Sequence, residues 1–281
     1  MHVIRAKTAG FCMGVSLALQ KLDSALQKGA YDRIYTLGPL IHNPQVLSAY
    51  EKKGVICADE HISLERGDCV VIRAHGIPQD KEAALRESGA IVIDATCPKV
   101  KKAQLAIAKA TAKGASLVLF GEADHPEVRG LISYAKGPSR VLTADFSLEN
   151  LDISLEKGLV LASQTTQDRE AFLELEQRMT LLYPRLTVLS TICDATKERQ
   201  EEARAIAKTV DIMVVVGGRQ SGNTRRLADV AASCGIETLL VETADEFDEK
   251  KFAQKRCAGL TAGASTPKSV IDAAEERLAA M

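Results

Sequence analysis

The sequence predicts an α/β fold of three small, pseudo-symmetric domains with mainly parallel sheets. One long pattern occurs three times, and each copy opens with a cysteine, at the ends of TAGFC (Cys12), IVIDATC (Cys97) and LTVLSTIC (Cys193). Short apolar runs alternate with longer stretches at helical spacing, which is the rhythm of parallel βαβ units. Runs such as SLVLF (116–120) and IMVVV (212–216) are continuously apolar, as in strands covered by helices on both faces.

The elements follow in the same order in each copy. Helical spacing begins directly after each cysteine, over 13–26, 98–110 and 194–208. An apolar strand that runs into a polar loop comes next, over 33–46, 116–128 and 211–224. A second strand, loop and helix follow over 69–87, 158–177 and 257–277. A repeat of this length indicates related domains, predicted at 13–97, 98–193 and 194–281, the last completed by the N-terminal strand 1–12.

Composition excludes several classes of protein. The chain has 281 residues, with 36 basic against 37 acidic, so it lacks the basic excess that nucleic-acid binding requires. No apolar run approaches the roughly 18 residues of a membrane span, and the N-terminus lacks the apolar core of a signal peptide. We therefore expect a cytoplasmic protein. Seven cysteines in a reducing compartment favour metal binding, catalysis or burial over disulfides.

The three repeated cysteines are the strongest candidates for metal ligands. Parallel sheets bind ligands beyond the carboxyl ends of their strands, where Cys12, Cys97 and Cys193 are predicted to lie. Three thiolates suit an iron–sulfur cluster with one open iron, or a zinc ion with an open fourth position. Separations of 85 and 96 residues match neither zinc ribbons nor ferredoxins, so equivalence within the repeat is the stronger argument. The other cysteines are expected to be small hydrophobic core residues: Cys57, Cys69, Cys234 and Cys257.

A second group of polar residues lies in the loops. His42, His75 and His125 all follow predicted strands beside proline or glycine, whereas His2 and His61 show no such placement. In the third copy the loops carry Ser221, Asn223 and Ser265 instead. Hydroxyls beside glycines before a helix can donate to phosphate, although ordinary helix capping uses the same residues. Neither a Walker loop nor a GxGxxG motif is present.

One carboxylate is a candidate proton donor. Glu127 lies two residues after His125, and Thr165 or Thr166 could relay a proton from the edge of the neighbouring strand. The alternative interpretation is a carboxylate that stabilises the N-terminus of a helix through its dipole.

Taken together, these segments resemble a known family. AGFCMGV, IHNPQV, RAHGIP, DATCPKV, DHPEVRG, SQTT, STICDATKERQ, GGRQSGNTRRL and TAGASTP occur in the order typical of 4-hydroxy-3-methylbut-2-enyl diphosphate reductases, from residue 9 to residue 267. The resemblance implies a [4Fe-4S] cluster bound by Cys12, Cys97 and Cys193 at the centre of the three domains. It implies that a diphosphate binds to His42, His75, Ser221, Asn223 and Ser265, and that His125, Glu127 and Thr165 serve the substrate hydroxyl and proton transfer. Gly222 departs from the family, which often has a second serine there, so only a backbone N–H remains to contact the diphosphate.

The activity that this resemblance implies is a two-electron reductive dehydration that gives isopentenyl and dimethylallyl diphosphate. Because no flavin or nicotinamide motif is present, electrons are expected from a partner such as ferredoxin or flavodoxin.

Three other classes of protein share part of this sequence pattern. An open-iron hydro-lyase would use the same cysteines without a reductant, a cluster-based redox sensor would not need the phosphate-binding loops, and a zinc hydrolase would hold zinc instead of iron.

Overall fold

The computed structural model describes residues 1–59, 62–143 and 151–281 of the chain. The described strands form three four-stranded sheets, and every pair of neighbouring strands is parallel, which confirms the predicted α/β class. Contacts divide the chain into two compact units. The first unit comprises residues 1–16, 41–53 and 194–281, and the second comprises residues 17–40 and 54–193. Each unit is described by itself below.

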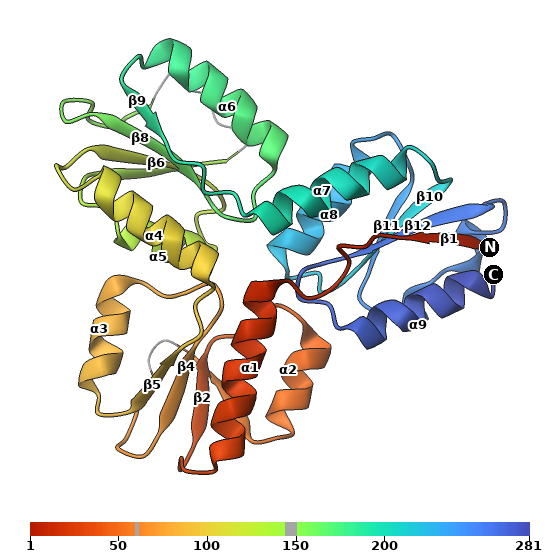
Figure 1. Ribbon diagram of the computed structural model, residues 1–281, viewed down its shortest axis with the longest axis horizontal. Helices are drawn as coiled ribbons and strands as arrows, with labels where there is room; N and C mark the ends of the chain where they lie inside the picture. Colours follow the sequence, from red (N-terminus) through yellow and green to blue (C-terminus); the bar gives the residue numbers. More distant parts are fainter. Residues whose placement is uncertain (60–61, 144–150) are drawn as a thin grey trace. The chain divides into compact units, whose positions relative to one another are not determined.

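The first unit is built on a sheet that joins the two ends of the chain. Its strands are, in spatial order, β1 (His2–Arg5), β12 (Cys257–Ala262), β10 (Ile212–Val216) and β11 (Thr238–Val241). Its helices are α2 (Pro44–Glu51), α7 (Asp194–Ala207), α8 (Gly222–Ala232) and α9 (Lys268–Ala279), with short 3-10 helices η2 (Ala244–Glu246) and η3 (Glu249–Lys251). Figure 1 shows α7 and α8 together on one face of this sheet and α9 on the other.

The packing of β10 explains why its sequence is continuously apolar. Ile212, Val214 and Val216 pack with α9, whereas Met213 and Val215 pack with α7 and α8. Successive side chains of a strand point to opposite faces, and both faces are covered here.

The second unit contains the other two sheets. The strands of one are, in spatial order, β3 (Val55–Ala58), β2 (Ile34–Leu37), β4 (Cys69–Ile72) and β5 (Ile91–Asp94), and those of the other are β7 (Ser139–Leu142), β6 (Ser116–Phe120), β8 (Leu159–Ser163) and β9 (Leu186–Val188). The helices are α3 (Gln79–Glu87), α4 (Pro98–Ala110), α5 (Pro126–Ser133) and α6 (Arg169–Leu182), together with most of α1 (Met13–Lys28).

The strand β6 shows the same double-sided packing as β10. Leu117 and Leu119 pack with α4 and α5, whereas Val118 and Phe120 pack with α6 on the opposite face of the sheet. In Figure 1, α4 and α5 lie on one side of this sheet and α6 on the other. The three helices predicted to follow the cysteines are confirmed, with α4 at its predicted bounds and with α1 and α7 ending within two residues of theirs.

All three sheets share one strand order. In the second unit, β2 lies between β3 and β4 with β5 beyond β4, and β6 lies between β7 and β8 with β9 beyond β8. In the first unit, β10 likewise lies between β11 and β12, and a fourth strand lies beyond β12. In the first unit this fourth strand is β1, which pairs with β12 from His2↔Cys257 to Arg5↔Leu260. The strands of each sheet run parallel, so their carboxyl ends lie along one edge, where loops bind ligands in folds of this kind.

Among the described residues, no helix is both long enough and apolar enough to cross a bilayer.

Candidate functional site

The three repeated cysteines occupy equivalent positions in their sheets. The helices α1, α4 and α7 each begin at the residue that follows one of them, namely Met13, Pro98 and Asp194. Each cysteine N–H donates to a carbonyl two residues beyond the end of the third strand of a sheet: Cys12 to Ala264 (3.2 Å), Cys97 to Ala74 (2.9 Å) and Cys193 to Thr165 (2.9 Å). The three sequence repeats therefore share the same backbone geometry around their cysteines.

The other four cysteines differ from one another. Cys69 is fully buried in β4, and burial raises the pKa of its thiol to about 11, as expected for a core residue. Cys234 and Cys257 are half-buried. The prediction of burial is wrong for Cys57, which is exposed on β3, because β3 is the edge strand of its sheet and is covered less completely than the strands inside. No disulfide forms among the seven cysteines, all of which lie within the described residues.

Glu127 is a buried carboxyl group held by Thr165. It lies in the first turn of α5, as the helix-dipole interpretation requires, but it is only 1% exposed. The Thr165 N–H donates to Glu127 Oε1 at 2.6 Å, and the Thr165 hydroxyl donates to Oε2 at 3.0 Å. Burial raises the pKa of Glu127 to about 7, although the two hydrogen bonds from Thr165 act in the opposite direction. A carboxyl group with this pKa can give up and regain a proton near neutral pH.

His75 and His125 lie against each other in the second unit. Their ring centroids are 5.2 Å apart, and the rings meet edge to face at 87°. His125 caps α5, because its Nδ1 accepts the Glu127 N–H at 3.1 Å. With Nδ1 as the acceptor, a neutral His125 carries its proton on Nε2, where it can donate to a ligand. Of the two histidines that the sequence does not place in the site, His2 is exposed on β1, and His61 lies outside the described residues.

The loops of the third repeat lie near His42 in the first unit. Ser265 is 6% exposed and donates its hydroxyl to the His42 carbonyl at 3.1 Å. Gly218 approaches the same carbonyl so closely that a Cβ at this position would lie 2.7 Å from the oxygen. A side chain at residue 218 would therefore displace the His42 backbone.

The start of α8 combines a helix cap with unused donors. Ser221 is the capping residue, and its oxygen accepts the Thr224 N–H at 3.3 Å, so the capping interpretation is correct for this residue. A capping hydroxyl that accepts through its oxygen can still donate its hydrogen to a ligand. Gly222 is the first helical residue, and the N–H groups of a first turn lack partners within the helix. The Asn223 Nδ2 is buried and has no hydrogen-bond partner among the described residues.

The predicted residues divide between the two units. The first unit holds Cys12, His42, Ser221, Gly222, Asn223 and Ser265, and the second holds His75, Cys97, His125, Glu127, Thr165 and Cys193. The contacts of Glu127 with Thr165, of His75 with His125 and of Ser265 with the His42 backbone each fall within one unit. Thr165 donates to Glu127 through both its N–H and its hydroxyl, so Thr165 is the better relay candidate of the two threonines.

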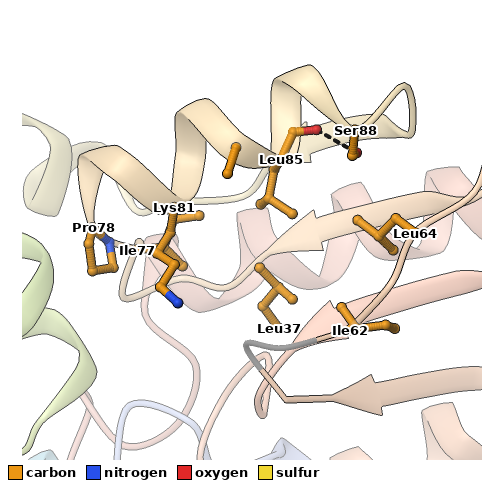
Figure 2. Close-up of a pocket in the computed structure, with 9 residues that line it drawn as sticks. Leu37, Ile62, Leu64, Ile77, Pro78, Lys81, Leu85 and Ser88 are labelled. Carbon is orange, nitrogen blue, oxygen red and sulfur yellow. Dashed lines mark hydrogen bonds between the residues drawn. The ribbon is translucent and has the colours of Figure 1, made fainter.

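An apolar hollow lies elsewhere in the second unit. It has a volume of about 140 Å³ and lies beneath α3, between Leu37, Ile77 and Leu85, with Lys81 on its wall (Figure 2). None of the predicted site residues lines it, so its apolar walls are separate from the polar groups described above.

Sequence patterns did not single out Arg199, although a signal for it was present. Arg199 shares one face of α7 with Ala203 and Ile206, at the spacing of residues that face a core. A charged residue in such an apolar stripe requires buried polar partners.

The chain is similar to known proteins over its whole length. A family model described as LytB protein matches residues 3–279. The 4-hydroxy-3-methylbut-2-enyl diphosphate reductase of Desulfovibrio desulfuricans is 62% identical, with all of both chains covered, and that of Oleidesulfovibrio alaskensis is 54% identical, with 99% of both covered.

Two solved structures share the fold. One is an (E)-4-hydroxy-3-methyl-but-2-enyl diphosphate reductase, described as the terminal enzyme of the non-mevalonate pathway; it is 38% identical with full coverage of both chains and a TM-score of 0.72. The other is the E-1-hydroxy-2-methyl-but-2-enyl-4-diphosphate reductase from Plasmodium falciparum, 26% identical over 96% of this chain and 86% of that one, with a TM-score of 0.91. The full-length match to the family model, the high identities and the shared fold lead to one conclusion: the chain belongs to the LytB family of 4-hydroxy-3-methylbut-2-enyl diphosphate reductases.

Proposed function

We propose that this protein reduces (E)-4-hydroxy-3-methylbut-2-enyl diphosphate to isopentenyl diphosphate and dimethylallyl diphosphate. The C–O bond to the allylic hydroxyl breaks, two electrons and two protons enter, and the oxygen leaves as water. The observation that carries this proposal is the 62% identity to a reductase along the entire chain.

The proposed cofactor is a [4Fe-4S] cluster bound by Cys12, Cys97 and Cys193. The residues fit such a group, because all three thiols are half-buried at the N-terminal end of a helix, where the helix dipole favours negative charge. When bound, a cluster with one iron not held by the protein would supply electrons and a Lewis-acidic iron. Three thiolates at equivalent positions of the repeat would leave one iron of a four-iron cluster open to substrate.

The proposed diphosphate site uses His42, His75, Ser221, Gly222, Asn223 and Ser265. Support comes from the start of α8, where the Ser221 hydroxyl, the Gly222 N–H and the buried Asn223 amide can all donate to anionic oxygens. The positive end of the helix dipole adds to this attraction. Because Gly222 offers only its N–H, we expect the departure from the usual serine to weaken binding slightly and to leave the reaction unchanged.

Proton transfer is assigned to Glu127, with His125 and Thr165. A neutral Glu127 can protonate the leaving oxygen, and burial favours this neutral form near pH 7. The Thr165 hydroxyl both donates and accepts, so it can pass a proton between Glu127 and the substrate hydroxyl. His125 can donate from Nε2 to the same substrate oxygen, since its Nδ1 is held by the Glu127 N–H.

The remaining assignments concern the electron donor, the compartment and the domain boundaries. The electron donor is proposed to be a ferredoxin or flavodoxin in the cytoplasm, where a reducing environment keeps cysteine ligands from forming disulfides. The three domains are proposed at 13–97, 98–193 and 194–281 with strand 1–12, and the pairing of β1 with β12 supports the placement of that strand in the third domain.

The activity can be tested with protein purified without oxygen. We expect iron and sulfide in the preparation, and two equivalents of a reduced one-electron dye consumed for each diphosphate product formed. Conversion of substrate without consumption of dye would instead indicate a hydro-lyase. Bound zinc in place of iron would indicate a hydrolase.

The diphosphate site predicts weaker binding when its donors are removed. Hydrogen bonds to charged groups contribute roughly 1.5–3 kcal/mol, so Ser265→Ala and Asn223→Ala should each weaken binding about 10- to 150-fold while the iron content stays normal. The measurement is calorimetric titration with substrate or inorganic diphosphate. Ser233→Ala is a matched control, because it removes a hydroxyl from the opposite end of α8, where Ser233 donates to the Val230 carbonyl at 2.8 Å. Unchanged affinity in both site variants would show that the loops of the third repeat do not bind diphosphate and that the start of α8 is only capped by its own residues.

A further inference from the structure

The α7 helix places an arginine in the core of the first unit. Arg199 is only 4% exposed and lies on the apolar face of the helix, one turn before Ala203 and two before Ile206. A buried guanidinium costs free energy unless its N–H groups find acceptors, so its partners indicate what the residue does.

Both partners of Arg199 are backbone carbonyls beside the Cys12 segment. One terminal nitrogen donates to the Ala262 carbonyl at 2.7 Å, and the other donates to the Gly10 carbonyl at 3.0 Å. Ala262 is the last residue of β12, and Gly10 lies two residues before Cys12. The planar guanidinium therefore joins the end of β12 to the loop that carries Cys12.

The Cys12 loop has little regular structure of its own. It connects β1 to α1, and Gly10 has a φ of +104°, a conformation that residues other than glycine rarely adopt. A second residue of α7 holds the beginning of the loop, because Glu202 accepts the N–H groups of Lys7 and Thr8, both at 2.8 Å. The location of Cys12 is thus determined largely by the contacts of its loop with α7 and by the hydrogen bond from the Cys12 N–H to the Ala264 carbonyl.

The charge of Arg199 is only partly balanced. Its hydrogen-bond acceptors are neutral carbonyls, and the nearby Glu202 carboxylate is hydrogen-bonded to Thr8 and Lys7. Burial lowers the pKa of Arg199, while the proximity of Cys12 and Glu202 acts to raise it. Arginine nevertheless keeps its proton in proteins, so a buried positive charge is hydrogen-bonded to the Cys12 loop two residues before the cysteine.

We propose that Arg199 is a positioning residue that fixes the Cys12 loop through two carbonyls and whose buried charge raises the reduction potential of whatever redox centre Cys12 binds. This inference rests on the proposed function for the nature of that centre. A buried positive charge stabilises the reduced form, which carries one more electron, over the oxidised form. The loop-fixing part concerns the polypeptide alone and holds with or without a cluster.

The charge is tested in the holoenzyme with Arg199→Gln, by redox titration followed by visible absorption or electron paramagnetic resonance. We expect the reduction equilibrium constant to fall about tenfold, which for one electron is a potential about 59 mV more negative. Arg199→Lys retains the charge and should stay close to the wild-type potential. Arg204→Gln is the matched control, since it removes the same charge from the same helix and should leave the potential unchanged. An unchanged potential in a folded Arg199→Gln protein would show that the electrostatic role is wrong.

The loop is tested in the full cluster-free chain with Arg199→Lys. An ammonium group cannot reproduce the two-pronged geometry of a guanidinium, so the loop should open more often and Cys12 should react several-fold faster with iodoacetamide. Mass spectrometry of the tryptic peptide 8–21 measures this rate, and the peptide containing Cys97 should react at its wild-type rate. Equal Cys12 rates in both proteins would overturn the positioning role. Absence of a cluster from the wild-type protein would count against the proposed function and leave this second test intact.

Discussion

Replacement of Cys12, Cys97 or Cys193 by serine is expected to lower the iron content sharply and to abolish reduction of the substrate. Each cysteine would provide one of three protein ligands, and a serine hydroxyl is a harder, weaker ligand for iron in a cluster than a thiolate. Iron and sulfide analysis together with visible absorption spectra would measure the loss in anaerobically purified variants.

The remaining cysteines provide the controls for this experiment. Cys57→Ser, Cys234→Ser and Cys257→Ser alter exposed or half-buried side chains and should leave the iron content normal. Cys69 is fully buried, so Cys69→Ala is the better control there, because a buried serine hydroxyl would need a hydrogen-bond partner. A normal iron content in the triple variant of Cys12, Cys97 and Cys193 would refute the ligand assignment.

Glu127→Gln is expected to lower the turnover rate roughly 100-fold or more while diphosphate binding remains. Glutamine preserves both contacts with Thr165, since its carbonyl can accept the Thr165 N–H and its amide can donate to the Thr165 hydroxyl. What is lost is the acidic proton. In the wild type, turnover should decline as the pH rises through about 7, where the buried carboxyl group ionises. Steady-state kinetics across this pH range measures both effects.

Stability provides an independent check on the same residue. The pKa of Glu127 is raised in the folded state, so its contribution to stability is present below its usual value of 4.5 and is lost as the pH rises through about 7. A shift of this size corresponds to roughly 3 kcal/mol at most. Glu127→Gln should therefore be as stable as the wild type or more so at pH 8.

The control for both experiments is Asp124→Asn, which neutralises an exposed carboxylate on the same loop and should change neither turnover nor stability. Loss of binding with normal turnover would place Glu127 among the ligand-holding residues instead.

Much of the fold could be predicted because it depends on short-range patterns. The strands β6 and β10 are apolar at every position since both faces are covered, and the helix after Cys97 begins and ends where its spacing predicts. The equivalence of the three cysteines was visible for the same reason, because each repeat preserves the order of its elements.

The contacts that define the chemistry could not be predicted in this way. Glu127 and Thr165 are 38 residues apart, and only the packing of α5 against its sheet brings the Thr165 hydroxyl to the Glu127 carboxyl group. Burial of Glu127, which raises its pKa, depends on the same packing. The exposure of Cys57 likewise follows from the position of β3 at a sheet edge, which strand order determines and local sequence does not.

The pairing of the first strand with the last one has a consequence for biosynthesis. The strand β1 is translated long before its partner β12, which begins at Cys257, and the carbonyl that accepts the Cys12 N–H belongs to Ala264. The N-terminal amino group of Met1 also reaches the carbonyls of Leu278 and Ala279, at the end of α9. In a chain that is still being translated, β1 therefore lacks its partner strand and Cys12 lacks its hydrogen-bond acceptor until residues up to Ala264 have been made. Contacts between such distant residues form slowly, so we expect β1 and the Cys12 loop to reach their native positions late in folding.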